Sequence, residues 1–108
     1  MAEALKLYLG TKLKFVLNVK VDGTAVTHSN IGNYDLRVEF RNGNRVVTLA
    51  SSDLLVGANS ELVAPLDTTM LGAGKVTMVT YVKIADSDFA DGYRVEVDRQ
   101  DVLFIRNV

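Results

Sequence analysis

The sequence has no cysteine, no tryptophan, one proline and one histidine among its 108 residues. Without cysteine there is no disulfide, no thiolate nucleophile and no cysteine-ligated metal site, so packing and hydrogen bonds must hold the fold. His28 is the one candidate base for a serine-based triad, and we interpret it as a solvated residue of a polar loop. No set of base, nucleophile and charge stabiliser is visible. The sequence therefore predicts neither an enzyme nor a bound cofactor.

A surplus of charge of either sign is missing as well. Twelve Lys and Arg residues stand against thirteen Asp and Glu residues, for a formal net charge of −1, and the two signs are interleaved, as in Arg37-Val38-Glu39. Nucleic-acid binding requires basic residues gathered on one face, so we do not expect it. No apolar run approaches the about 20 residues that cross a bilayer, and the N-terminus lacks the pattern of a secretory signal. Because 48% of the residues are apolar, we expect one compact domain over residues 1–108 and no membrane association.

What the sequence does contain is apolar residues with a period of two, which is typical of strands with one face in a core. Asp22-Gly23 has the composition of a tight turn, and Asn42-Gly43-Asn44 is the clearest hairpin signal, because Asn and Gly tolerate a positive φ. The predicted strands are 13–21, 34–41, 45–50, 61–66, 75–84, 93–97 and 102–105.

The stretch around the only proline combines a strand with a turn. Pro65 donates no ladder hydrogen bond, so we expect the 61–66 strand to lie at a sheet edge or to end there. Asp67 is placed to cap a single helical turn over Thr68–Leu71, which Gly72 would terminate. About seven short strands and one helical turn predict an all-β, immunoglobulin-like antiparallel β-sandwich, with a closed barrel as the alternative architecture.

Three aspartates, Asp86, Asp88 and Asp91, lie in one loop and form the best candidate for a calcium site. Their spacing departs from an EF-hand loop, because Gly92 falls one place late and Ala90 stands where an oxygen ligand is required. Aspartates in such loops also bind their own backbone. Both interpretations stay open, and no metal ligand is assigned.

Some apolar residues occupy strand positions that are expected to face water. They are Val16 in the first predicted strand and Val79 with Tyr81 in the 75–84 strand. Leu5, Leu7 and Leu9 alternate with Lys6 and Tyr8, which indicates a further strand at the N-terminus. Such residues either cover the rims of the sandwich or form a contact with another subunit.

Four segments, in this order, carry a family resemblance. They are Leu7-Tyr8-Leu9-Gly10-Thr11, the strand containing Phe15, the segment from Leu66 to Gly74, and the segment from Asp86 to Glu96. The sequence resembles the immunoglobulin-like N-terminal domain of baseplate upper proteins and related small fibre proteins of tailed phages that infect gut bacteria. The likeness covers nearly the whole chain. Its most specific parts are the Asp-Thr-Thr-x-Leu-Gly-x-Gly turn and the Asp-x-Asp-Phe-x-Asp-Gly-x-Arg loop.

The resemblance implies a docking module that anchors a fibre or appendage to a phage particle. Two features depart from the family: Ala90 stands where proline is expected, and the sequence ends at Val108 without a receptor-binding or helical extension. The chain therefore looks like a virion protein in its own right, a head-fibre or baseplate subunit or a capsid-bound adaptor, with capsid, fibre or baseplate proteins as partners. It would be assembled in the bacterial cytoplasm and located in the virion.

We expect association through an outer sheet face or through edge-strand pairing, with a homodimer favoured. A competing hypothesis is a carbohydrate-binding or adhesin-like sandwich, which needs exposed rings. Tyr81 and Tyr93 would serve, because Tyr34 is expected to face inward. In the protein-contact hypothesis, Phe89 is an anchor and Arg94 a partner for a carboxylate. The candidate contact residues are Tyr8, Leu9, Val79, Tyr81, Phe89 and Arg94.

Overall fold

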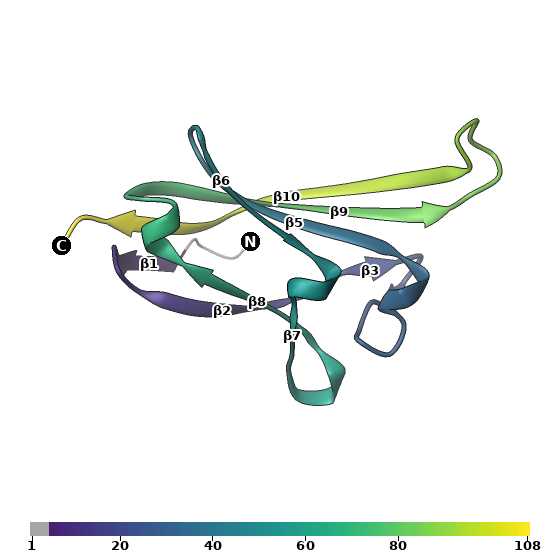
Figure 1. Cartoon of the computed structure of the whole chain (residues 1–108), viewed down its shortest axis with the longest axis horizontal. Coiled ribbons are helices and arrows are strands. Elements are labelled where there is room, and N and C mark those ends of the chain that lie inside the picture. The colour runs from purple at the N-terminus through teal and green to yellow at the C-terminus, as the bar shows by residue number, and fades with distance from the viewer. Residues whose placement is uncertain (1–4) are drawn as a thin grey trace.

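The computed structural model describes residues 5–108 and has an all-β, sandwich-like fold (Figure 1). Within these residues, seven strands have four residues or more, and no helix is long and apolar enough to cross a membrane. The predicted strands 93–97 and 102–105 are one continuous strand, the predicted 13–21 strand is interrupted after Leu17, and the further strand indicated at the N-terminus is present. The strands are β1 (Leu5–Tyr8), β2 (Lys12–Leu17), β3 (Lys20–Val21), β4 (Thr24–Ala25), β5 (Asp35–Asn42), β6 (Arg45–Ala50), β7 (Leu55–Val56), β8 (Leu62–Asp67), β9 (Gly74–Ala85) and β10 (Tyr93–Arg106). The 3₁₀ turns are η1 (Ile31–Asn33), η2 (Ser51–Asp53), η3 (Ala58–Ser60) and η4 (Thr68–Met70).

Two sheets face each other. A five-stranded sheet in the order β1-β10-β9-β5-β6 lies over a three-stranded sheet in the order β2-β8-β7, and β3 and β4 form a separate hairpin. Both sheets have edge strands and neither closes on itself, so the fold is a sandwich and not a closed barrel. One pair is not antiparallel: β1 runs parallel to the end of β10, from Leu5 beside Leu103 to Tyr8 beside Arg106. A purely antiparallel arrangement is therefore wrong here, because β1 leads into β2 of the opposite sheet instead of returning through a hairpin.

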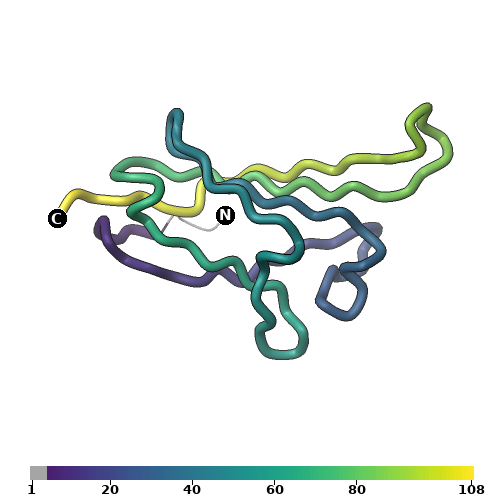
Figure 2. Tube along the Cα trace, viewed as in Figure 1, coloured from purple at the N-terminus to yellow at the C-terminus, as the bar shows by residue number. Residues whose placement is uncertain are grey.

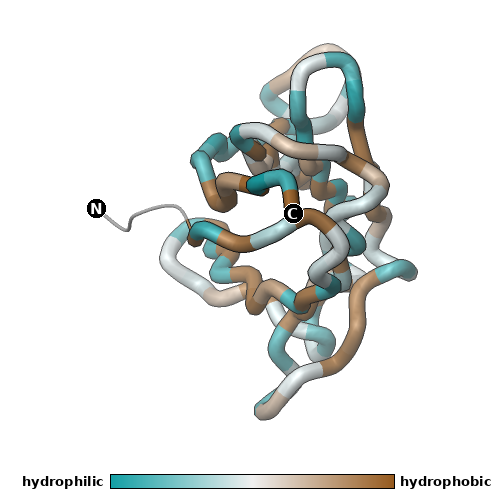
Figure 3. Tube along the Cα trace, turned by 90° about the vertical axis from the view of Figure 1, so that its left-hand side faces the viewer, coloured by the Kyte–Doolittle hydropathy of each residue, from teal (hydrophilic) through white to brown (hydrophobic). Residues whose placement is uncertain are grey.

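The core is one cluster of apolar side chains between the sheets. β5 is the clearest case, because Leu36, Val38 and Phe40 are buried while alternate residues are not, as its period of two predicts. Apolar and polar stretches alternate along much of the trace in Figure 3. The Phe40 ring packs against that of Phe15 from β2, with 5.3 Å between the centroids, so the two layers meet at this pair.

Both predicted tight turns are present. Asn42 pairs with Arg45, so Gly43 and Asn44 form a two-residue hairpin loop between β5 and β6, with Gly43 at φ 57°. Asp22 and Gly23 both have positive φ and connect β3 to β4. The first prediction is confirmed, and the second turn closes a hairpin where the sequence indicated only the start of a loop.

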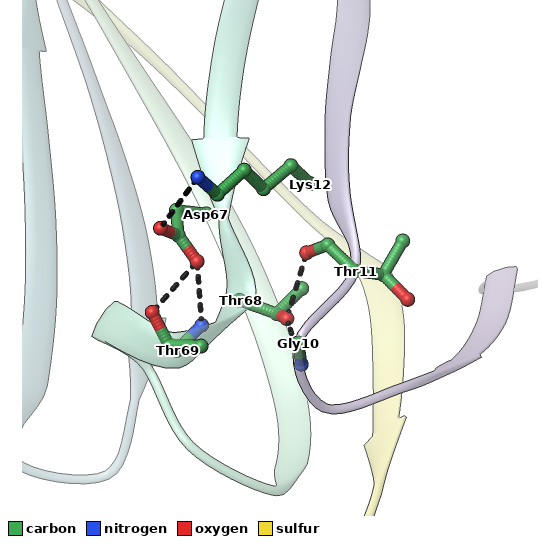
Figure 4. A network of polar contacts seen from close by, with 6 residues as sticks. All are labelled: Gly10, Thr11, Lys12, Asp67, Thr68 and Thr69. Carbon is green, nitrogen blue, oxygen red and sulfur yellow. Dashed lines mark hydrogen bonds and ion pairs between the residues drawn. The ribbon is translucent and has the colours of Figure 1, made fainter.

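The predicted helical turn after β8 is also present, as η4. The Asp67 carboxylate accepts hydrogen bonds from the Thr69 amide (3.0 Å) and hydroxyl (2.7 Å), and the Thr69 hydroxyl holds the pKa of Asp67 below its ordinary value (Figure 4). The hydroxyl of the buried Thr68 accepts from the Gly10 amide (3.0 Å) and donates to the Thr11 carbonyl (2.8 Å). The turn thus ties the end of β8 to the crossing between β1 and β2.

Pro65 lies in β8, which stands between β2 and β7, so the expectation that its strand lies at a sheet edge is wrong. β7 pairs only with Leu62 and Val63, however, so no β7 residue lies beside Pro65. Its one cross-strand neighbour is Lys14 of β2. The missing donor therefore falls where the ladder on one side has already ended.

Candidate functional site

The hairpin of β9 and β10 is the longest element of the fold, and its loop projects at one end of the molecule (Figure 2). The Asp86 amide donates to the Gly92 carbonyl (2.8 Å) and closes this loop. The Asp86 carboxylate accepts from the Asp88 amide, and the Asp91 carboxylate from the Tyr93 amide. Within the described residues, no three His, Cys, Asp or Glu side chains lie close enough to hold a metal ion. The arrangement favours the interpretation in which the aspartates bind their own backbone.

A β-bulge divides β10 into two halves: even-numbered side chains face the core before it, and odd-numbered side chains face the core after it. The register against β9 shifts between Asp101 and Leu103. Before the bulge, the even-numbered residues align with the inward-facing residues of β9, as Glu96 does with Val82. After it, Leu103 and Ile105 are buried. One extra residue reverses which side chains face the core, so the odd-numbered apolar residues of the first half point outward.

These outward residues form an exposed apolar row. We call Tyr93, Val95 and Val97 the β10 stripe; their side chains are 43%, 54% and 59% exposed. Phe89 in the adjoining loop is half exposed, as an anchor residue requires. The sequence predicts an exposed ring at Tyr93 but does not predict that Val95 and Val97 are exposed, because unbroken alternation with Leu103 and Ile105 places these valines in the core. The signal against it is that the same unbroken alternation would also turn the charged Arg99 and Asp101 inward.

Val79, at the centre of the outer face, is buried and not exposed as the sequence predicts. Its side chain is only 4% exposed, so it is not a contact residue, and that prediction is wrong. β9 lies between β5 and β10, and Val79 is flanked in register by Glu39 and Arg99, whose longer side chains stand on the same face.

Tyr81 is half-buried, and two arginine side chains contact it, one over the ring and one at the hydroxyl. The Arg37 guanidinium lies 4.3 Å from the ring centroid, and Arg41 donates to the Tyr81 hydroxyl (3.2 Å). Lys83 covers the ring of Tyr93 in the same way, at 4.2 Å. Tyr34 packs against the core, as expected. Both rings that a sugar would need are therefore already occupied on one face.

Glu39 lies between these arginines and links them. Arg41 donates to its carboxylate through two nitrogens, one of them Nε at 3.2 Å, and the Arg37 Nε lies 4.0 Å away. Hydrogen bonding from Arg41 holds the pKa of Glu39 below its ordinary value of 4.5, although partial burial opposes this. The carboxylate therefore contributes stability that is fully present above its unfolded-state pKa and is lost as the pH falls through its folded-state pKa.

We expect Glu39→Gln to lower the free energy of unfolding by about 1 kcal/mol at neutral pH, with the difference from wild type shrinking as the pH falls below 4.5. Urea unfolding at a series of pH values measures this. Glu61→Gln is the control, because Glu61 makes no ion pair among residues 5–108. A pH profile that is the same for both variants would contradict the assignment.

Of the three other candidate residues, the fold uses Leu9 and Arg94 and leaves Tyr8 exposed. Tyr8 is 58% exposed on β1 and stays available, whereas Leu9 packs against the core and donates its amide to the Arg106 carbonyl. Arg94 faces inward and binds Asp22 at 3.1 Å, and the hydrogen bond to this carboxylate raises the pKa of Arg94. Its carboxylate partner is therefore within the chain.

His28 is half-buried, so the expectation of a solvated residue is wrong. Its Nε2 lies 2.9 Å from the Leu55 carbonyl oxygen, and its amide donates to the Ser60 carbonyl. The imidazole thereby connects the loop after β4 to β7, which is a structural role.

Comparisons with protein-family models, with curated proteins and with solved structures find no match to this chain. The surface features that remain are the β10 stripe, the projecting loop with Phe89, and Tyr8 at the β1 edge. Each offers contact area to a macromolecule.

Proposed function

We propose that this chain is a structural subunit of a tailed-bacteriophage particle, a small fibre or adaptor protein that acts by binding other virion proteins and carries out no catalysis. The resemblance in the Asp67–Gly74 and Asp86–Arg94 segments supports the phage assignment. The first segment fastens the crossing between the sheets, and the second forms the tip of the projecting hairpin.

The observation that carries the proposal is the β10 stripe. Three neighbouring apolar side chains on one outer sheet face are each at least 43% exposed, next to a half-exposed Phe89. Contiguous exposed apolar side chains, unlike scattered ones, are typical of a surface that another protein covers. Capsid, fibre or baseplate proteins are the partners, and packing of two stripes is the expected route to a homodimer.

A carbohydrate-binding module is the weaker proposal. Such a site stacks a sugar on an open ring, and Lys83 lies over Tyr93 while Arg37 lies over Tyr81. A glycan array that gives binding lost on Tyr93→Ala would favour it over the virion role.

Substitution of the stripe tests the proposed function. In particles of the phage that encodes the chain, we expect wild-type protein at a fixed copy number, measured by mass spectrometry of purified virions. The double variant Val95→Lys/Val97→Lys should be absent from them and should sediment as a monomer where the wild type sediments as a dimer, because charges on the stripe oppose its burial.

Val46→Lys is the matched control, since Val46 is also about half exposed but lies on β6, the opposite edge strand of that sheet. It should enter particles normally. Genes of metabolism around the coding sequence, or virions without the chain, would overturn the proposal.

A further inference from the structure

The first half of β10 is a strand with only one neighbour. β9 pairs along its whole length, whereas β1 covers only Leu103–Arg106. Within residues 5–108, no strand pairs with Tyr93–Val102 on the side away from β9. This stretch is therefore an open sheet edge, distinct from the β10 stripe, which is a set of side chains on the outer face.

The backbone of this edge has a defined orientation. The Gly92 carbonyl points toward β9, where it accepts from the Asp86 amide. Because residues alternate between the two sides of an antiparallel ladder, the even-numbered residues up to Gln100 turn their amides and carbonyls to β9. Tyr93, Val95, Val97 and Arg99 then turn theirs to the open side. An added strand needs such a row of donors and acceptors at every second residue.

A groove lies directly below the edge. A cavity of about 350 Å³ separates β10 from the link between β2 and β3, and its lining includes the apolar side chains of Leu17 and Met78. Glu96 and Asp98, which face inward from β10, line it as well. Every second side chain of an added strand would enter this groove, and the others would lie beside Val95 and Val97.

The groove favours basic side chains. Glu96 and Asp98 make no ion pair among the described residues, and Lys20 is the one basic residue lining the cavity. Opposite charges on neighbouring strands stabilise a pair, and like charges destabilise it.

A second copy of this chain fits the edge poorly. Added antiparallel with Val97 opposite Val97, it sets Glu96 of each copy against Asp98 of the other. With the register centred on Asp98, the two Asp98 side chains face each other. Both of these registers place carboxylates together. With Val95 opposite Val95, the residue opposite Glu96 is Arg94, which already binds Asp22 of its own chain at 3.1 Å. A different protein, whose basic side chains are not engaged in this way, is therefore favoured.

We propose that Tyr93–Val102 is a strand-addition site for an extended segment of a partner protein in which basic and apolar side chains alternate. The basic side chains lie in the groove near Glu96 and Asp98, and the apolar ones extend the β10 stripe on the outer face. The inference deepens the proposed function and rests on it, in that the partner is a protein.

A short synthetic peptide of alternating lysine and valine is the probe, with an alternating glutamate and valine peptide as its control. We expect the lysine peptide to bind about tenfold more tightly in a titration followed by NMR. It should slow hydrogen exchange at the amides of Val95, Val97 and Arg99, which point to the open side. Equal binding of both peptides, or no protection at these amides, would overturn the proposal.

Two variants separate backbone pairing from charge. Arg99→Pro removes an amide that does not pair with β9, and proline is tolerated at an edge, so the fold should remain while peptide affinity falls about tenfold. Arg99→Thr keeps the amide and should bind like wild type. Glu96→Gln with Asp98→Asn preserves shape and should remove the preference for lysine. A preference that survives this change contradicts the charge assignment.

The outcome is independent of the particle experiment. If the peptide does not bind but the Val95→Lys/Val97→Lys variant is absent from virions as expected, strand addition alone is rejected. Peptide binding by a chain that is absent from virions would reject the phage role and keep the strand site.

Discussion

Phe40→Ala should lower the free energy of unfolding by about 3–5 kcal/mol, the largest stability effect expected for a single substitution in this chain. Phe40 is fully buried, and its ring packs on that of Phe15 from the opposite sheet. Truncation removes the contact that joins the layers and leaves a cavity. Because small domains are stable by only about 5–15 kcal/mol, the variant should be close to unfolding at room temperature. Urea unfolding followed by circular dichroism measures the shift in midpoint.

Phe104→Ala is the matched control for this change. Phe104 lies on β10 with 44% of its side chain exposed, and we expect its truncation to cost less than about 1 kcal/mol. Equal effects at the two phenylalanines would mean that the layers do not meet as described.

Gly74→Ala should destabilise the protein by about 3 kcal/mol. Gly74 begins β9 with φ +132°, a conformation that L side chains rarely adopt, and an added Cβ would lie 2.9 Å from the Asn42 Oδ1. The Asn42 side-chain amide donates to the carbonyls of Leu71 (3.0 Å) and Ala73 (2.9 Å). Displacing it therefore breaks the bonds that hold η4 against the end of β5, and thermal unfolding measures the loss.

Gly32→Ala provides the comparison, because Gly32 has no positive φ and no atom within 4 Å of the added methyl group. Its effect should stay within about 0.5 kcal/mol. In the double variant Asn42→Ala/Gly74→Ala the steric conflict is gone and the backbone strain remains. A Gly74→Ala cost that is unchanged in that background would show that the contact with Asn42 is unimportant.

Local rules account for most of the fold. The alternation in 34–41, the Gly43-Asn44 loop and the cap at Asp67 depend on neighbouring residues only, and all three are present. The parallel pair of β1 and β10 was not predictable, because it joins residues that are about a chain length apart and no local pattern encodes such a contact. The central position of the strand containing Pro65 was not predictable either, because it depends on β7 being too short to reach Pro65, and sequence alone does not show this.

The candidate site was predicted less well, for one geometric reason. A period of two assigns a face only if the register is unbroken, and the bulge after Asp101 breaks it. Val95 and Val97 were therefore missed. Alternation predicts an exposed Val79, because it says nothing about the length of the neighbouring side chains, and those of Glu39 and Arg99 flank it.

The parallel pairing of the first and last strands decides how the protein responds to tension. A pull between the two ends draws Leu5 backward and Arg106 forward, along strands that lie side by side and run in the same direction. The force shears the pair, so its hydrogen bonds bear the load together and do not unzip one after another. A subunit joined to its neighbours through both ends would resist mechanical extension at this seam.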